Sequence, residues 1–439
     1  MRRGPTRGSA LADAAAINAT LRPLAQHRRF IIAASGGPDS LALMIAAGRW
    51  AAARDREACV VTVDHRLRRA SASEAAFVAE AAARLGLPHH TLNWDAAKPA
   101  AGVQNAARAA RYALIADFAR AGGYTAVATG HTLDDQAETV LMRLARGGGV
   151  DGLSAMAIVT PLCEGVDLVR PFLSVSKAEI TAYLRRRGER WMTDPSNEDV
   201  RFERVRIRRA LRTLRGLGVD ARAIAASAAR LGRARRALHI LAAEWRAAAG
   251  VLHPEGWLEF DAAAFRASPA EIVIHAMTEA LEQVSGGGQP RLSKVEASCA
   301  QLQAGRRGKR TLGGCVIELS ADRVSVRREE GRMRGHVITL QPGASAVWDG
   351  RFLVSLAPEC PEPVSVAALG AHARDLPGLK TAPPRDVLRA TPAFFAAGRL
   401  VAAPVAAAAP DAGSHALARF CRAELRAFPP ARVILPGAI

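Results

Sequence analysis

Residues 30–50 read FIIAASGGPDSLALMIAAGRW, and this stretch decides the fold class. The apolar run Phe30–Ala34 predicts a strand that is buried on both faces. A glycine-rich loop, Ser35–Ser40, follows it, and Leu41–Trp50 has helical character. We therefore expect a strand–loop–helix unit, in which loop N–H groups and the start of the helix can hold an anion such as phosphate.

Short apolar runs alternate with helical segments over the first 190 residues. Further strands are expected at Cys59–Val63, His90–Trp94 and Tyr124–Thr129, and helices at 73–85, 104–122, 134–146 and 176–187. This alternation predicts an α/β fold, a parallel sheet with helices on both faces. Ligands of such sheets bind at the carboxyl ends of the strands, and the polar clusters of this chain follow its predicted strands.

The pattern changes near residue 200. Twelve arginines between Arg201 and Ile240 face only Glu203 and Asp220, so about half of the net charge of +19 lies in this stretch. We expect the first domain to cover residues 1–215 and a helical domain to cover 216–305. Short strand patterns then predict a small C-terminal α+β domain at 306–439.

The composition restricts the class of protein. The chain has 439 residues, of which 49% are hydrophobic and 23% charged, as in globular proteins of several domains. A net charge of +19 indicates a polyanionic partner, either nucleic acid or an anionic membrane surface, unless it serves solubility alone. The six cysteines lack C-x-x-C spacing, and no segment predicts a signal peptide or a membrane span. We expect a cytoplasmic protein with no membrane partner.

The loop itself carries unusual chemistry. Its glycines let the backbone approach a phosphate, and its serines add hydroxyl donors. Asp39 would repel a phosphate unless a cation lay between them, which indicates Mg²⁺. The alternative is a glycine turn in which Asp39 only caps the helix. The residues concerned are Ser35, Gly36, Gly37, Pro38, Asp39 and Ser40.

Three further motifs favour the phosphate-binding interpretation. They are VDHRLR at 63–68, GHTLDDQAET at 130–139, and DPSN at 194–197 with RFERVRIR at 201–208. In this order, together with SGGPDS, they resemble the tRNA(Ile)-lysidine synthases, a family of PP-loop ATP pyrophosphatases. The resemblance is dense over residues 28–210. Arg66, Gly130 and Val205 depart from it, because the family usually has Gly, His and Asn there.

The resemblance implies an ATP-dependent ligase that uses Mg²⁺. The 2-carbonyl oxygen of the wobble cytidine, in the CAU anticodon of an isoleucine tRNA, attacks the α-phosphate of ATP and becomes adenylated. The ε-amine of free L-lysine then attacks C2 and AMP leaves. Adenylation is needed because a urea-like carbonyl has a poor leaving group. The product, lysidine, pairs with A, so the anticodon reads AUA.

The resemblance also implies roles for individual residues. The expected catalytic residues are Asp39, Asp135, Lys177 and Arg206, with Asp135 as a candidate base for the amine. The expected metal ligands are Asp39, Asp134 and Asp135. The expected nucleotide contacts are the loop, Asp64, His65 and His131. The expected RNA contacts are Arg108, Arg111, Arg204, Arg208 and Arg209.

Simpler structural roles exist for several of these residues. Asp134 or Asp135 can cap a helix, and His131 can pack in a core. Lys177 can be a solvated surface residue. Arg108 and Arg111 can brace their helix rather than contact RNA.

Three other functions remain as alternatives. A base-thiolating PP-loop enzyme would typically carry paired cysteines, which this chain lacks. Synthetases of small molecules share the loop but do not need the basic stretch after residue 200. A non-catalytic RNA-binding protein would not need Asp39 of the loop or the adjacent pair Asp134 and Asp135, which we call the DD pair.

Overall fold

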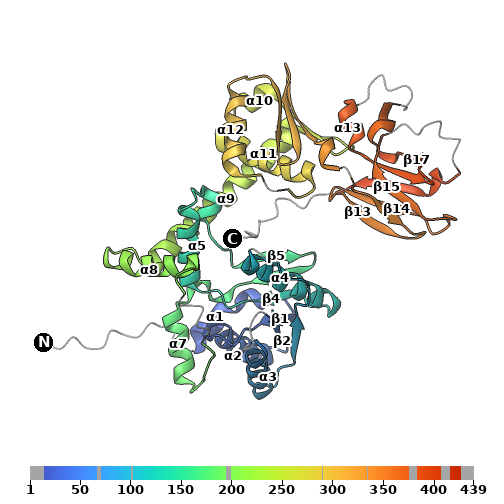
Figure 1. The fold of residues 1–439 in the computed structure, drawn as a ribbon. Helices are drawn as coiled ribbons and strands as arrows, with labels where there is room; N and C mark the ends of the chain where they lie inside the picture. The colour runs from blue at the N-terminus through green and yellow to red at the C-terminus, as the bar shows by residue number, and fades with distance from the viewer. Residues whose placement is uncertain are drawn as a thin grey trace. The chain divides into compact units, whose positions relative to one another are not determined.

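The computed structural model describes residues 14–66, 71–99, 102–193, 199–288, 290–333, 335–374, 383–406 and 416–426. It contains two compact units, one that ends at Arg235 and one that begins at Arg236 (Figure 1). None of the described helices is both long and apolar enough to cross a lipid bilayer.

The first unit is built on a six-stranded sheet of order β3-β2-β1-β4-β6-β5. Its strands are β1 (Arg29–Ala33), β2 (Glu57–Asp64), β3 (His89–Asn93), β4 (Ala126–Ala128), β5 (Val159–Cys163) and β6 (Val166–Val169). All neighbours pair in parallel except β5, which forms an antiparallel hairpin with β6 at the edge. The predicted α/β fold with a parallel sheet is therefore confirmed, with one added antiparallel strand.

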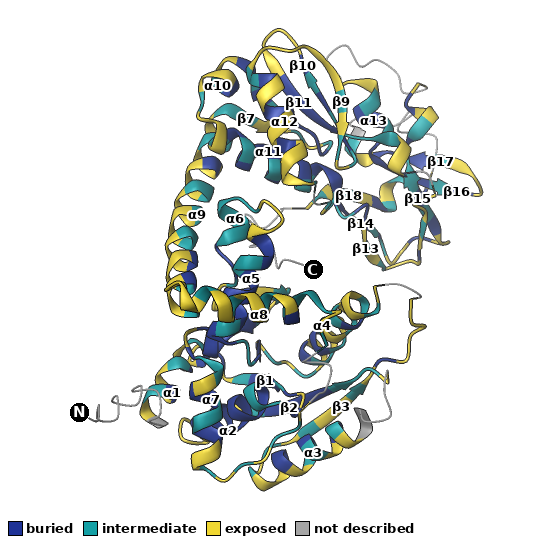
Figure 2. Cartoon of the chain, turned by 60° about the vertical axis from the view of Figure 1, so that its left-hand side comes forward, coloured by how far each residue is buried: buried dark blue, intermediate teal, exposed yellow. Residues whose placement is uncertain are grey.

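Helices surround this sheet. They are α1 (Ala14–Thr20), α2 (Pro38–Ala52), α3 (Ser71–Arg84), α4 (Val103–Ala121), α5 (Leu133–Leu144), α6 (Val150–Leu153), α7 (Lys177–Arg186) and α8 (Glu203–Gly216). A further helix, α9 (Ala221–Ala249), begins in the first unit and ends in the second. Burial is dense along α2, whereas α9 is largely exposed (Figure 2).

The apolar run of β1 is continuous because both faces of the strand are buried. Phe30 and Ile32 pack in the core that contains α2, α3 and α7. Ile31 points to the opposite face, into a second core with Ile115 of α4. A strand covered on one face only would alternate apolar and polar residues. Full burial of β1 fixes the position of the loop that follows it.

The second unit contains three antiparallel sheets. Their orders are β7-β8-β11-β10-β9, β12-β15-β16-β17 and β13-β14-β18. The strands are β7 (Gly250–Leu252), β8 (Leu258–Asp261), β9 (Gly308–Leu312), β10 (Cys315–Leu319), β11 (Arg323–Arg328), β12 (Ile338–Leu340), β13 (Ser345–Trp348), β14 (Phe352–Leu356), β15 (Val364–Ala368), β16 (Pro392–Ala396), β17 (Arg399–Ala402) and β18 (Cys421–Leu425). The helices are α10 (Ala262–Ala267), α11 (Ala270–Ser285), α12 (Leu292–Gln303) and α13 (Arg385–Arg389).

Residues 216–305 are less purely helical than expected. Strands β7 and β8 lie within this range, and β8 pairs with β11, for example Phe260 with Val324. One sheet therefore includes strands from both sides of residue 305. The domain boundaries at 215 and 305 stay a prediction.

A buried ionic cluster lies inside the second unit. Arg328 donates to both carboxylate oxygens of Asp349, at 3.0 and 2.7 Å, and Arg351 donates to Asp349 Oδ2 at 2.7 Å. Arg351 and Asp349 are almost fully buried. This cluster joins the sheet that contains β11 to the part of the chain that begins with β13.

Candidate active site

The loop between β1 and α2 is closed by hydrogen bonds of Ser40. Ser35 N donates to Ser40 Oγ at 3.1 Å, and this hydroxyl donates to the carbonyl of Gly37 at 3.1 Å. Gly36 has a φ of +80°, which an L residue adopts only with strain. Pro38 begins α2, where its missing N–H costs nothing. Residues 35–40 therefore form a pre-shaped turn at the start of a buried helix.

A second segment supports this loop from behind. Gly130 follows β4, and a Cβ atom at this position would lie 2.8 Å from the carbonyl oxygen of Asp39 and 3.0 Å from Ser40 N. Backbone atoms cannot move aside as a flexible side chain can. The end of β4 and the loop therefore pack backbone to backbone, which brings the DD pair close to Asp39.

Asp135 caps α5, as one of the alternatives for the DD pair proposes. Its Oδ2 accepts hydrogen bonds from Thr132 N and Thr132 Oγ1, at 2.8 and 2.7 Å, and its N–H donates to Thr132 Oγ1. Asp134 accepts a hydrogen bond from the backbone N–H of Lys177, at 2.7 Å. The two acids thus orient the start of α5 and tie it to the start of α7.

Lys177 is not a solvated surface residue. Its ammonium lies 3.0 Å from Asp135 Oδ1 and 3.9 Å from Glu138 Oε1. Glu138 is fully buried and also accepts a hydrogen bond from Arg208 Nε of α8, at 2.8 Å. We call Asp39, Asp134, Asp135 and Glu138 the acid corner. Glu138 is the residue of this group whose role was missed from the sequence.

The electrostatics of the acid corner separate its members. Burial raises the pKa of Asp39 to about 7, Lys177 opposes this shift, and the charges of Asp135 and Asp134 add to it. Burial acts in the same sense on Asp135, but Lys177, His131 and the hydrogen bonds from Thr132 prevail and hold its pKa well below the usual range. A carboxylate with a lowered pKa is a weak base, so these contacts disfavour Asp135 as the base for the amine.

The acid corner has the donor chemistry of a divalent cation site. Asp39 Oδ1 and Glu138 Oε2 are buried and have no hydrogen-bond partner among the residues that the structure describes. Buried carboxylate oxygens are rarely left unpaired. Several hard oxygen donors that converge beside a phosphate-binding loop suit Mg²⁺. The two unpartnered oxygens belong to Asp39 and Glu138, whereas Asp135 and Asp134 already accept hydrogen bonds here, so the predicted metal ligands Asp39, Asp134 and Asp135 stay a prediction.

A basic and aromatic group lies on the other side of the loop. Arg111 of α4 donates to Nε2 of His65, which directly follows β2. The Arg108 guanidinium lies 5.2 Å from the centre of the Tyr112 ring. Asp64 Oδ1 accepts a hydrogen bond from Arg66 N, at 2.8 Å. Arg111 thus contacts a predicted nucleotide residue.

His131 interacts electrostatically with Asp135 of the acid corner and with Arg108 of the basic and aromatic group. Burial, opposed by Asp135, lowers the pKa of His131 to about 3, and Arg108 and Arg204 are among the charges that contribute. The ring is therefore neutral at pH 7. Its Nδ1 lies 2.9 Å from Thr129 Oγ1. A neutral ring can hydrogen-bond a phosphate oxygen without adding charge.

Helix α8 presents arginines in different directions. Arg208 points to Glu138, whereas Arg209 is exposed and Arg204 is half-buried. Arg206, a predicted catalytic residue, is exposed and donates to the carbonyls of Val200 and Arg201. Arg206 is a residue of α8 whose guanidinium thus contacts the turn before this helix rather than the acid corner. The motif at Asp194–Asn197 lies outside the described residues.

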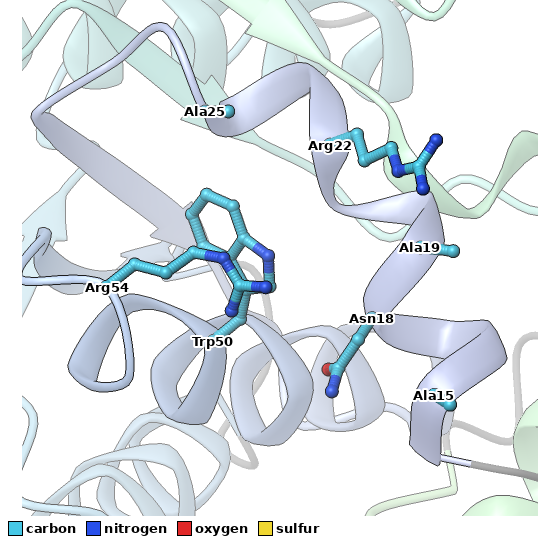
Figure 3. A pocket seen from close by; sticks show the side chains of 7 residues that line it. All are labelled: Ala15, Asn18, Ala19, Arg22, Ala25, Trp50 and Arg54. Atoms are coloured by element: carbon cyan, nitrogen blue, oxygen red, sulfur yellow. The ribbon is translucent and has the colours of Figure 1, made fainter.

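A pocket of about 260 Å³ lies elsewhere on the first unit, at the opposite end of α2 from the loop. Its walls come from α1, the turn after it and the end of α2, and the guanidinium of Arg54 stacks on the Trp50 ring (Figure 3). None of the predicted site residues lines it.

The chain is similar to known proteins over most of its length. The PP-loop domain family matches residues 11–214. The tRNA(Ile)-lysidine synthase of Ruegeria pomeroyi is 40% identical over 395 residues, which cover 86% of this chain and 89% of that protein. Its namesake in Bradyrhizobium diazoefficiens is 42% identical and covers 69% and 91%. The corresponding protein of Rhodopseudomonas palustris is 45% identical and covers 67% and 89%.

Proposed function

This chain belongs to the family of tRNA(Ile)-lysidine synthases, and from this premise we propose that it joins L-lysine to C2 of the wobble cytidine of a CAU-bearing isoleucine tRNA. The reaction converts ATP to AMP and pyrophosphate. The observation that carries the proposal is the acid corner beside the pre-shaped phosphate loop. The two lie together because the backbone of Gly130, before α5, packs against the backbone of Asp39 in the loop.

The first step adenylates the base. The N–H groups of residues 35–40 and the start of α2 hold the phosphates of ATP. The 2-carbonyl oxygen of cytidine attacks the α-phosphorus, and the bond to pyrophosphate breaks. Asp39, Asp134 and Asp135 would hold Mg²⁺, which would supply positive charge beside the phosphates. His131 stays neutral and contributes a hydrogen bond rather than charge.

Lys177 pairs with Asp135 of the acid corner, and we assign it a second role at the α-phosphate. Asp39, Asp135 and Glu138 all raise the pKa of Lys177 against the effect of burial, so the side chain is charged at neutral pH. An ammonium at this edge of the sheet stabilises negative charge that develops on the α-phosphate. Asp135 orients Lys177, and this role replaces that of a base.

The second step transfers lysine. The free ε-amine attacks C2 of the adenylated base, the C–O bond to AMP breaks, and the attacking nitrogen releases a proton to water. The acid corner suits an amino-group substrate, because its carboxylates already hold one ammonium and one guanidinium. A target base inside the anticodon loop must be unstacked to reach these groups.

Exposed arginines supply the contacts for RNA. The residues Arg209, Arg212 and Arg215 of α8 are exposed, and the only acidic residue of this helix is Glu203 in its first turn. Such a surface attracts phosphates without reading the sequence of the bases. We assign recognition of the tRNA body to residues beyond 215, because isoleucine and methionine tRNAs can share the CAU anticodon.

The test measures labelled lysine incorporation and AMP release with purified isoleucine tRNA. Asp39→Ala should abolish both activities, whereas Asp117→Ala, an exposed residue of α4, should leave them intact. Full incorporation with Asp39→Ala contradicts the site. Mass spectrometry of the digested tRNA distinguishes a lysine adduct from the sulfur that a thiolating enzyme would add.

A truncation tests the division of labour. A chain that ends near residue 215 should lose discrimination between the two tRNAs more than it loses ATP affinity. An equal loss of both would contradict the assignment of tRNA recognition to the later part of the chain.

A further inference from the structure

The pocket at the end of α2 contains none of the residues assigned to the reaction. Trp50, which lines it, lies about 18 Å along the helix axis from Pro38, at 1.5 Å per residue. Its volume of about 260 Å³ is close to about 300 Å³, the lower end for pockets that hold small ligands. All of its lining residues belong to the first unit. It is therefore a second cavity, separate from the phosphate loop.

The walls of this pocket are held by the core beneath them. Leu21 and Leu24, in the turn after α1, are fully buried in the core that also contains Trp50. Arg56 Nη2 donates to the carbonyl of Ala25 at 2.9 Å, which ties the rim of the pocket to the segment before β2. The pocket is therefore pre-formed, and a ligand would not have to order its walls.

The charged groups of the pocket are all positive. Arg22 and Arg54 line it, both are exposed, and neither guanidinium forms an ion pair with a carboxylate that the structure describes. The amide of Asn18 is the other polar group from the α1 side, and none of the lining residues is acidic. A guanidinium offers only N–H donors. The pocket therefore favours an anion.

Trp50 adds a further donor and a flat surface. The residue is only 3% exposed, and among the described residues none accepts a hydrogen bond from its indole N–H. This nitrogen is not one of the fully buried unpartnered atoms, so a ligand can reach it. Figure 3 shows it on the edge of the ring that faces α1, with the Arg54 guanidinium over the ring at 4.9 Å from the centroid. A guanidinium stacked in this way offers its other face to a second ring.

We propose that this pocket binds a free nucleoside monophosphate, with its phosphate between Arg22 and Arg54 and its base against Arg54 and Trp50. A phosphate dianion matches two guanidinium groups. A base supplies both a π face for the stacked guanidinium and acceptors for the indole N–H. The methyl groups of Ala15 and Ala19 complete the wall and suit the sugar. The proposal is independent of the lysine-ligation reaction, because the two sites share no residue.

The indole N–H of Trp50 is itself the reporter for the test. Nitrogen-15 labelling of tryptophan gives one indole NMR signal for each of the six tryptophans, and Trp50→Phe identifies the signal of Trp50. Titration with AMP should move this signal until it saturates, in the parent protein and in Asp39→Ala alike, because the phosphate loop is not involved. The proposal is wrong if AMP leaves the signal in place, or if tRNA moves it and AMP does not.

Two arginine variants and a matched control locate the phosphate. Arg22→Gln and Arg54→Gln should each raise the Kd for AMP, read from the Trp50 signal, at least about 10-fold through the loss of one charge-assisted contact. Arg49→Gln removes an exposed arginine of the same helix end that does not line the pocket, and it should leave the Kd unchanged. The other five indole signals report whether each variant keeps its fold. Equal weakening by Arg49→Gln indicates general charge attraction and overturns the site.

Fragments of the nucleotide test its two halves separately. Adenosine lacks the phosphate and inorganic phosphate lacks the base, so each should bind at least about 10-fold more weakly than AMP. Inorganic phosphate that binds as tightly as AMP refutes the base contact, and adenosine that binds as tightly refutes the arginine contacts. A parent protein that binds AMP here but incorporates no lysine would refute the proposed function and leave this inference standing.

Discussion

Replacement of Gly130 by Ala should damage the phosphate loop without touching any reacting group. The new Cβ atom would lie 2.8 Å from the Asp39 carbonyl oxygen, whereas ordinary contacts begin near 3.4 Å. The loop and the end of β4 must therefore separate by the difference, 3.4 − 2.8 = 0.6 Å. Crowding of this kind costs about 1–3 kcal/mol of folding free energy. A catalytic group displaced by about 1 Å costs about 100-fold in rate, so the rate should fall at least about 10-fold.

Two assays check this prediction together. AMP release with tRNA and lysine reports the rate, and thermal unfolding reports the stability of the free protein. Gly216→Ala, at the end of α8, is the matched control, because a Cβ there meets no atom within 4 Å. The control should be neutral or slightly stabilising. Unchanged rate and unfolding temperature for Gly130→Ala would refute the argument that β4 sets the position of the loop.

Four further perturbations follow from the site. Because the pKa of Asp39 is raised to about 7, ionising this group destabilises the folded protein increasingly as the pH rises from 4 through 7. At pH 8, Asp39→Asn should therefore raise the free energy of unfolding by about 1–3 kcal/mol. Added Mg²⁺ should stabilise the parent protein and not the variant. The pKa values of His65 and His131 are lowered to about 4 and 3, so denaturant titrations should show stability falling, by up to about 2 kcal/mol per ring, as pH drops from 6.5 to 5. Glu138→Ala should cost about 2–3 kcal/mol in chemical unfolding, because it leaves Lys177 and Arg208 with less compensating charge, and Glu138→Gln should cost less. Three exposed arginines of α8 can be changed to Gln together, namely Arg209, Arg212 and Arg215. In filter-binding assays, the slope of log K for tRNA against log salt concentration should become smaller by about 2–3. The Kd for ATP should stay unchanged.

The sequence predicts the centre of the first unit because local signals there agree. The run from Phe30 to Ala34 needs two covered faces, and SGGPDS needs a turn and a helix start, so strand, loop and helix follow from one stretch. The DD pair was placed correctly at the start of a helix. Its two functions, capping and charge, could not be separated until Thr132 and Lys177 were located beside it.

Long-range partners could not be predicted. Glu138 pairs with Arg208, 70 residues further along the chain, and this contact depends on how α5 and α8 pack. The same limit applies to Arg111, whose contact with His65 requires α4 to cover β2. The spacing of Asp135 and Glu138, three residues apart on one helix, was the one local signal that both acids share a face.

No strands were expected at β5, β6, β7 or β8, for identifiable reasons. Pro161 interrupts the apolar run of β5 (Val159–Cys163), and this strand is possible because it lies at the sheet edge, where proline is tolerated. The turn between β5 and β6 contains Gly165, whose φ is +73°. This single glycine was the one turn signal of the hairpin in the sequence. Strands β7 and β8 are brief and lie between long helices, so helical periodicity on both sides obscured them.

The pairing of β8 with β11 has a practical consequence for anyone who dissects this chain. A fragment that stops near residue 305 keeps β8 but loses its neighbour, so a row of unpaired backbone groups becomes an open edge. Such an edge recruits other copies of itself, and the fragment should precipitate or form oligomers on expression. A shortened protein that behaves badly would then report a severed sheet rather than a missing tRNA contact.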